Sequence, residues 1–165
     1  MKINIRSGEE LNNLLDGLAR EIVNANIYHR LFCSLVDSID TYKREIRQSN
    51  TFWGLTLEAL KEARLINLCR VYDQESNSLN LVNLLHTIKA NFHLFEDHHF
   101  RDRLQGNAFI DSLAQDNRLP SADQLDEDIS FSSCQNVLVK KLIVWRNNIA
   151  AHKGAKVSLG KKQIL

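Results

Sequence analysis

Apolar residues recur at intervals of three and four along most of this chain, which is the spacing of one face of an α-helix. The capping-box pattern Ser7-Gly8-Glu9-Glu10 precedes the first stripe and predicts a helix start. The stripe itself consists of Leu11, Leu14, Leu15, Leu18 and Ile22. No segment alternates apolar and polar residues over the length of a β-strand. The sequence therefore predicts an all-α protein, an antiparallel bundle of four or five helices.

The next segments repeat this helical spacing of apolar residues. A second stripe runs from about Ile27 to Ile46, and the sequence leaves open whether it continues the first helix. Ser49-Asn50-Thr51 offers N-caps for a helix whose apolar residues, through Tyr72, point in most directions. Such breadth predicts a central helix buried on most sides. A polar connection at 73–78 leads to a short fourth helix.

The C-terminal third is less regular before it becomes helical again. Between residues 91 and 128 we expect one more helical piece, then a short helix capped at Ser121-Ala122-Asp123-Gln124. Ser132-Ser133-Cys134-Gln135 is predicted to cap the last helix, and Gly154 to end it. One apolar face of that helix would carry Leu138, Leu142, Trp145 and Ile149. We expect a helical domain over 1–153 and a basic tail over 154–165.

Composition indicates a single cytoplasmic domain without a cofactor. The 165 residues suffice for one core, and no run has the length of a membrane span or the form of a signal peptide. The three cysteines, Cys33, Cys69 and Cys134, lie in apolar surroundings and are predicted to be buried free thiols in a reducing compartment. Phosphate-loop, nucleophile-elbow and Cys-x-x-Cys motifs are missing, and the spacing of His86, His93, His98 and His99 matches no metal-ligand pattern.

Charge is distributed unevenly, since no acidic residue follows Asp128. A segment of one sign suits a polyanion such as nucleic acid, although a solvated helix face and tail would look the same. Its cationic residues are Lys140, Lys141, Arg146, Lys153, Lys156, Lys161 and Lys162. Farther upstream, Arg70 and Asp73 are three residues apart and could form an ion pair across one helical turn, or serve a functional pocket.

The strongest candidate site is Arg146-Asn147-Asn148-Ile149-Ala150-Ala151-His152, a polar cluster that ends an apolar helix. Residues six apart on a regular helix differ by about 240° in direction. Arg146 and His152 would therefore converge only if the last turn deviates or if the pair acts across a subunit boundary. A structural reading also exists, in which the cluster terminates the helix through backbone hydrogen bonds.

These residues resemble the Arg-x(4 to 6)-His signature of HEPN ribonucleases, which are helical bundles. Phe52-Trp53, Leu68-Cys69-Arg70-Val71-Tyr72-Asp73 and Ser78-Leu79 make the chain similar to the AbiU-type abortive-infection HEPN family over roughly Leu11 to Lys153. In HEPN toxins silenced by nucleotide addition, a tyrosine usually stands two residues after the histidine. Gly154 occupies that position here, which departs from this mode of control.

The resemblance implies an antiviral or toxin-type endoribonuclease that needs no metal and assembles as a homodimer with a composite site. Arg146 would stabilise the phosphate, His152 would transfer the proton, and Asn147 would orient one of them. Secondary contacts with RNA would come from Lys141, Asn148, Lys153, Arg70 and Asp73. Two alternatives remain: a non-catalytic HEPN module that binds RNA or protein, and a toxin neutralised by a cognate antitoxin.

Overall fold

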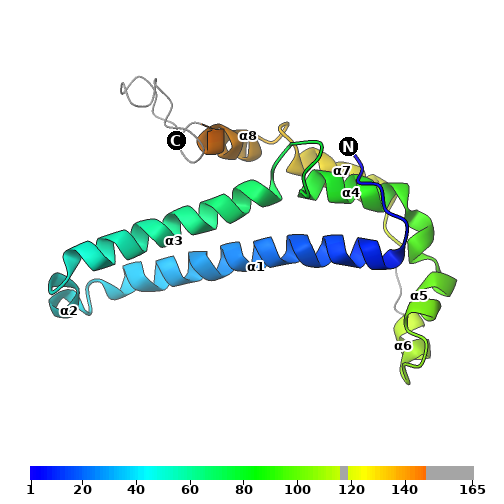
Figure 1. Cartoon of the computed structure of the whole chain (residues 1–165), viewed down its shortest axis with the longest axis horizontal. Coiled ribbons are helices and arrows are strands. Elements are labelled where there is room, and N and C mark those ends of the chain that lie inside the picture. Colours follow the sequence, from blue (N-terminus) through cyan, green and yellow to red (C-terminus); the bar gives the residue numbers. More distant parts are fainter. Residues whose placement is uncertain (116–118, 148–165) are drawn as a thin grey trace.

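The computed structural model describes residues 1–115 and 119–147, and within these ranges every regular element is a helix. The predicted all-α class is confirmed. Figure 1 shows α1 (Gly8–Ser38) and α3 (Asn50–Val71) side by side as a long hairpin. The short α2 (Lys43–Arg47) lies at the turn between them.

The remaining helices gather around the opposite end of this hairpin (Figure 1). There α4 (Leu81–Ala90) packs against α7 (Ala122–Ser132), and α8 (Val137–Trp145) lies over the C-terminal end of α3. Three shorter pieces connect α4 to α7: the 3-10 helix η1 (Phe92–Phe95), α5 (Asp97–Arg103) and α6 (Ile110–Gln115).

Helix α1 begins at the predicted capping box and is longer than its first stripe. The Ser7 hydroxyl accepts a hydrogen bond from the Glu10 N–H at 3.2 Å, and the Glu10 carboxylate accepts one from the Arg6 N–H at 2.6 Å. The helix continues without a break to Ser38, so the two N-terminal stripes belong to one element. Asn24-Ala25-Asn26, between the two stripes, has a weak helix propensity. The packing of α3 along α1 outweighs it and keeps the helix continuous.

The core lies where the N-terminal part of α1 and the C-terminal end of α3 meet α4. Leu11 and Leu18 of α1, Val71 of α3 and Leu84 of α4 are buried against one another. Around them pack Ile5, Leu14, Tyr72, Leu81, Ile88, Leu94 and Phe95. This core fixes the last turn of α3, and therefore the position of the connection that follows it.

That connection is held by two buried polar side chains, that of the N-cap of α4 and that of a residue in its first turn. Asn80, which is fully buried, caps the helix by accepting a hydrogen bond from the Asn83 N–H at 2.8 Å and donates through its amide to the Glu75 carbonyl at 3.0 Å. The Asn83 amide donates to the carbonyls of Glu75 and Ser78, both at 2.9 Å. Because buried polar groups are costly when unpaired, these bonds hold residues 73–79 in one conformation.

Helix α3 is not buried on most sides, contrary to the sequence prediction. Phe52, Leu55 and Ile66 are 58%, 67% and 38% exposed, because α1 covers one side of α3 and the smaller helices lie only near its two ends. The cysteine prediction was also partly wrong. All three thiols are free, but only Cys69 is buried, and Cys134 is exposed.

The start of the last helix differs from the prediction as well. Ser132 ends α7, and α8 begins at Val137 with Asn136 as its cap, whose side-chain oxygen accepts from the Leu138 N–H at 2.9 Å. Leu138 is exposed, and Val139 is buried instead. Ile149, Gly154 and the predicted tail lie outside the described residues.

No helix in the described part of the chain is both long enough and apolar enough to span a membrane.

Candidate functional site

The candidate site lies at the C-terminal end of α8, where the helix changes its winding. The α-helical pattern ends at Trp145, and Arg146 and Asn147, the last described residues, have π-helical character. The sequence offered such a deviation as one of two ways to bring Arg146 and His152 together. The structure shows the deviation at Arg146, while His152 lies outside the described residues, as do Asn148 and Lys153.

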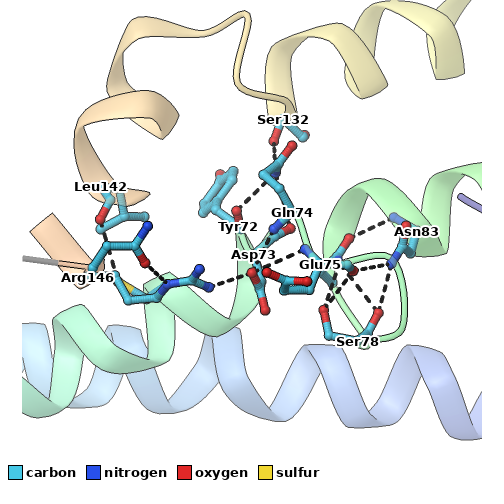
Figure 2. Close-up of polar contacts among 12 residues, drawn as sticks. Tyr72, Asp73, Gln74, Glu75, Ser78, Asn83, Ser132, Leu142 and Arg146 are labelled. Atoms are coloured by element: carbon cyan, nitrogen blue, oxygen red, sulfur yellow. Dashed lines mark hydrogen bonds and ion pairs between the residues drawn. The ribbon is translucent and has the colours of Figure 1, made fainter. Parts of the chain in front are cut away.

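Arg146 is fixed by an ion pair with Asp73, at the end of α3 (Figure 2). Arg146 Nη1 donates to Asp73 Oδ1 at 2.5 Å, and the two side chains are 27% and 16% exposed. Arg146 Nε donates to the side-chain oxygen of Asn147 at 3.1 Å. The guanidinium group is therefore oriented by two acceptors, the Asp73 carboxylate and the side-chain oxygen of Asn147.

Asp73 is itself held by the backbone of its own loop. Its Oδ1 accepts hydrogen bonds from the N–H groups of Gln74 at 2.8 Å and Glu75 at 3.3 Å. Burial raises the pKa of this carboxyl, but the hydrogen bonds from Arg146 and the backbone and the charge of Arg146 together hold that pKa below its ordinary value. Asp73 is therefore an ionised partner for Arg146 at neutral pH.

Gln74 connects this loop to the helix that precedes α8. Its amide nitrogen donates to the Ser132 carbonyl at 3.2 Å and to the Tyr72 carbonyl at 3.0 Å (Figure 2). Ser132 is the last residue of α7, so the two segments that flank the site are joined by a side chain. The position of Asp73 thus depends on α3, α4 and α7 together.

Cys69 lies beneath the site and plays a structural part. Its thiol is 3.9 Å from the Leu142 carbonyl of α8, to which it donates. Burial raises the pKa of this thiol to about 11, an effect that Arg146 opposes and Asp73 reinforces. A thiol protonated at neutral pH is a poor nucleophile, so we assign Cys69 to packing between α3 and α8.

The site retains capacity to bind an anion. A guanidinium group has five N–H donors, and the hydrogen bonds among the described residues engage two of those on Arg146. A mainly apolar cavity of about 190 Å³ lies between the C-terminal end of α3, the end of α7 and α8, and the Arg146 side chain does not line it. Its lining residues are Tyr72, Phe131, Asn136, Leu138, Val139 and Leu142.

The other predicted contact residues are placed differently. Arg70 does not pair with Asp73 but with Glu21 of α1, at 3.3 Å, with 62% of the Arg70 side chain exposed. Lys141 is exposed on α8. The sequence singled out both Asp73 and Arg146 but missed their pairing, because no spacing rule connects residues so far apart along the chain. In residues 1–115 and 119–147, no group of three or more His, Cys, Asp or Glu side chains is arranged to hold a metal ion.

Comparison with protein-family models gives a match to HEPN_AbiU2, described as AbiU2, over residues 8–165. The chain belongs to the AbiU2 family of HEPN proteins. Neither the curated proteins nor the solved structures provide a match. In this AbiU2 protein, two of the segments that carried the resemblance, Leu68–Asp73 and Arg146–Asn147, are joined by the Asp73–Arg146 ion pair.

Proposed function

We propose that this AbiU2 protein is a metal-independent endoribonuclease that acts in abortive infection or as a toxin-type effector. The observation that carries the proposal is the orientation of Arg146. Its guanidinium group is anchored on Asp73 and Asn147, and the hydrogen bonds within residues 1–115 and 119–147 engage two of its five N–H donors. A pre-oriented cation of this kind suits the negative charge that develops on a phosphate during cleavage.

RNA supplies its own nucleophile, the 2′-hydroxyl. In the proposed reaction this oxygen attacks the adjacent phosphorus, and the 5′-oxygen of the next nucleotide leaves. Arg146 stabilises the phosphate oxygens, and His152 exchanges the proton as general acid or base, a role typically worth 10²- to 10⁴-fold. The products would be a 2′,3′-cyclic phosphate and a free 5′-hydroxyl, which end-group analysis can identify.

Asp73 acts in this proposal as a positioning residue. Its carboxylate partly compensates the charge of Arg146, and in exchange it restricts the guanidinium to one orientation. A catalytic group held in its reactive orientation raises the rate, because the entropy cost of ordering that group is paid before the transition state is reached. Asn147 acts from the opposite side, through its bond to Arg146 Nε. Lys141, Asn148, Lys153 and Arg70 would contact the RNA backbone.

A homodimer would complete the site. The described helices expose large apolar residues that a monomer has no evident reason to present to water. Those on the long helices and on α8 are Leu15, Ile22, Val23, Ile27, Leu31, Val36, Phe52, Leu55, Ile66, Val137 and Leu138. Burying part of this surface between two copies would bring two α8 ends together, as the composite site requires.

An RNase assay in the presence of a chelator tests the reaction. The wild type is expected to cleave RNA, and Arg146→Ala and His152→Ala to lose at least about 10²-fold in rate. Arg20→Ala removes an exposed arginine of α1 and serves as the matched control, with unchanged cleavage expected. Cleavage by Arg146→Ala at the wild-type rate, or none by the wild type, would contradict the proposal.

A non-catalytic HEPN module is the second candidate, and one observation favours it. The charge of Arg146 is already compensated by Asp73 within the chain. Such a module would bind RNA or protein without cleaving RNA, and His152→Ala would leave binding unchanged. Neutralising the C-terminal lysines would weaken binding to RNA. Measuring binding and cleavage on the same variants separates the two functions.

A further inference from the structure

An exposed phenylalanine lies at the end of α7, beside the candidate site. Phe131 is 65% exposed and lines the cavity of about 190 Å³ between α3, α7 and α8. Leu138, which is 71% exposed, lines the same cavity from α8. Single apolar side chains on a surface need no explanation, but two of them around one cavity form a patch that a binding partner can cover.

Tyr72 contributes a second aromatic ring to this cavity. It packs against the buried core at the C-terminal end of α3, so its position is fixed by the fold. Figure 2 shows Tyr72 between Leu142 of α8 and Ser132 of α7. One aromatic ring held by the core and another left in solvent offer π-faces on which a planar ring can stack.

The cavity adjoins the Asp73–Arg146 ion pair on two elements, although Arg146 does not line it. On α3, Tyr72 directly precedes Asp73. On α8, Leu142 lies four residues before Arg146, which is roughly 6 Å along a helix axis. A phosphate at Arg146 would therefore have the cavity within the reach of a base from the same or the adjacent nucleotide.

The lining of the cavity suits a neutral ring better than a phosphate. None of its lining residues is charged, and the polar one is Asn136. The Asn136 amide donates to the Phe131 carbonyl at 2.9 Å, and its oxygen accepts from the Leu138 N–H at 2.9 Å. An amide has two N–H donors and two lone pairs, so hydrogen bonds among the described residues engage half of this capacity. The volume is below the ~300 Å³ of sites for drug-sized molecules and fits a single ring system.

We propose that this cavity binds one unpaired nucleobase of the RNA whose phosphate lies at Arg146, with the base stacked on Phe131 and Tyr72. The proposal rests on the proposed function, from which it takes RNA as the substrate. It adds that the substrate is single-stranded at the cleavage site. A base inside a duplex is stacked between its neighbours and cannot enter the cavity, whereas a base in a loop or at an end can be splayed out.

Binding of uncleavable tetranucleotides to the full chain tests the proposal. Tetramers of 2′-O-methyladenosine and, separately, of 2′-O-methyluridine lack the 2′-hydroxyl nucleophile, and an abasic tetramer with the same number of phosphates lacks the bases. In fluorescence anisotropy, the wild type is expected to bind at least one base-bearing tetramer about fivefold or more tightly than the abasic one. Phe131→Ala is expected to remove this difference and to leave the affinity for the abasic tetramer unchanged.

Three further variants separate stacking from other effects. Phe131→Trp should retain the preference for bases, and Phe131→Leu, which keeps an apolar side chain without a π-face, should lose most of it. Phe109→Ala is the matched control, because Phe109 is 72% exposed and precedes α6, and the preference should be unchanged. Arg146→Ala should weaken base-bearing and abasic tetramers alike.

The proposal is overturned if the wild type binds all tetramers equally or none, or if Phe131→Ala keeps the preference for bases. A Phe131→Ala protein that becomes monomeric and loses both kinds of tetramer would make Phe131 a subunit contact instead. The RNase assay with a chelator reads the proposed function separately. Base-dependent binding without cleavage would retain the base site and refute the ribonuclease, and cleavage with a KM for single-stranded RNA unaffected by Phe131→Ala would do the reverse.

Discussion

Arg146 forms its ion pair with a residue 73 positions earlier in the chain. Neither residue alone identifies the contact: Asp73 reads as a helix-end acid paired with Arg70, and Arg146 as part of a motif. The structure assigns Arg70 to Glu21 and leaves Asp73 for Arg146. The contribution of the charged Asp73 carboxyl to the stability of the fold can therefore be tested by substitution.

Replacing Asp73 with Asn is expected to reduce the free energy of unfolding by about 1 to 2 kcal/mol at pH 7. The pKa of Asp73 is below its ordinary value in the folded protein. The ionised carboxyl therefore stabilises the fold above the unfolded pKa of about 3.9, and this stabilisation is lost as pH falls through the folded pKa. Urea unfolding of both proteins at pH 7 and pH 2.5 should show the difference shrinking. Glu21→Gln, on the exposed pair, should change stability much less.

At the scale of elements, the helix caps divide into exposed and buried ones. Ser121 caps α7 through a hydrogen bond of 3.4 Å from the Gln124 N–H, at an exposed position. Asn80 caps α4 while fully buried, and it also binds the connection that carries Asp73. Loss of the capping side chain should therefore destabilise the protein more at α4 than at α7.

Asn80→Ala is expected to lower the free energy of unfolding by about 2 to 3 kcal/mol, because it removes a cap together with the other hydrogen bonds of a fully buried side chain, among them the one to the Glu75 carbonyl. Ser121→Ala should lower it by about 1 kcal/mol or less. Chemical denaturation of the two variants beside the wild type measures both values. Equal losses would mean that the buried contacts of Asn80 add nothing to its capping bond.

At the scale of the whole molecule, the hairpin leaves much apolar surface exposed. Two helices packed side by side cover only one face of each other, and the smaller helices other than α2 gather at one end of the hairpin (Figure 1). Leu138 is 71% exposed on α8, two turns before Arg146, and Leu55 is 67% exposed on α3 near α2. These two leucines distinguish possible positions of a dimer interface.

Leu138→Glu is expected to shift the proposed dimer towards monomer at micromolar concentration and to reduce cleavage with it, because the charge would be buried beside the composite site. Leu55→Glu is the matched control at the distant end of the hairpin and should leave the dimer intact. Sedimentation velocity measures both variants. A dimer that tolerates Leu138→Glu but not Leu55→Glu would place the interface away from α8.

The sequence by itself determined the all-α class, the N-caps at Ser7 and Ser121, and the family, because helical period, caps and motifs are local patterns of residues a few positions apart. It could not determine that α1 is one helix, that α3 has an exposed face, or that α8 begins after Asn136. Those features depend on what each helix packs against. The contact of Arg146 with Asp73 was likewise decided only by tertiary structure, since packing brings together charges that no sequence spacing relates.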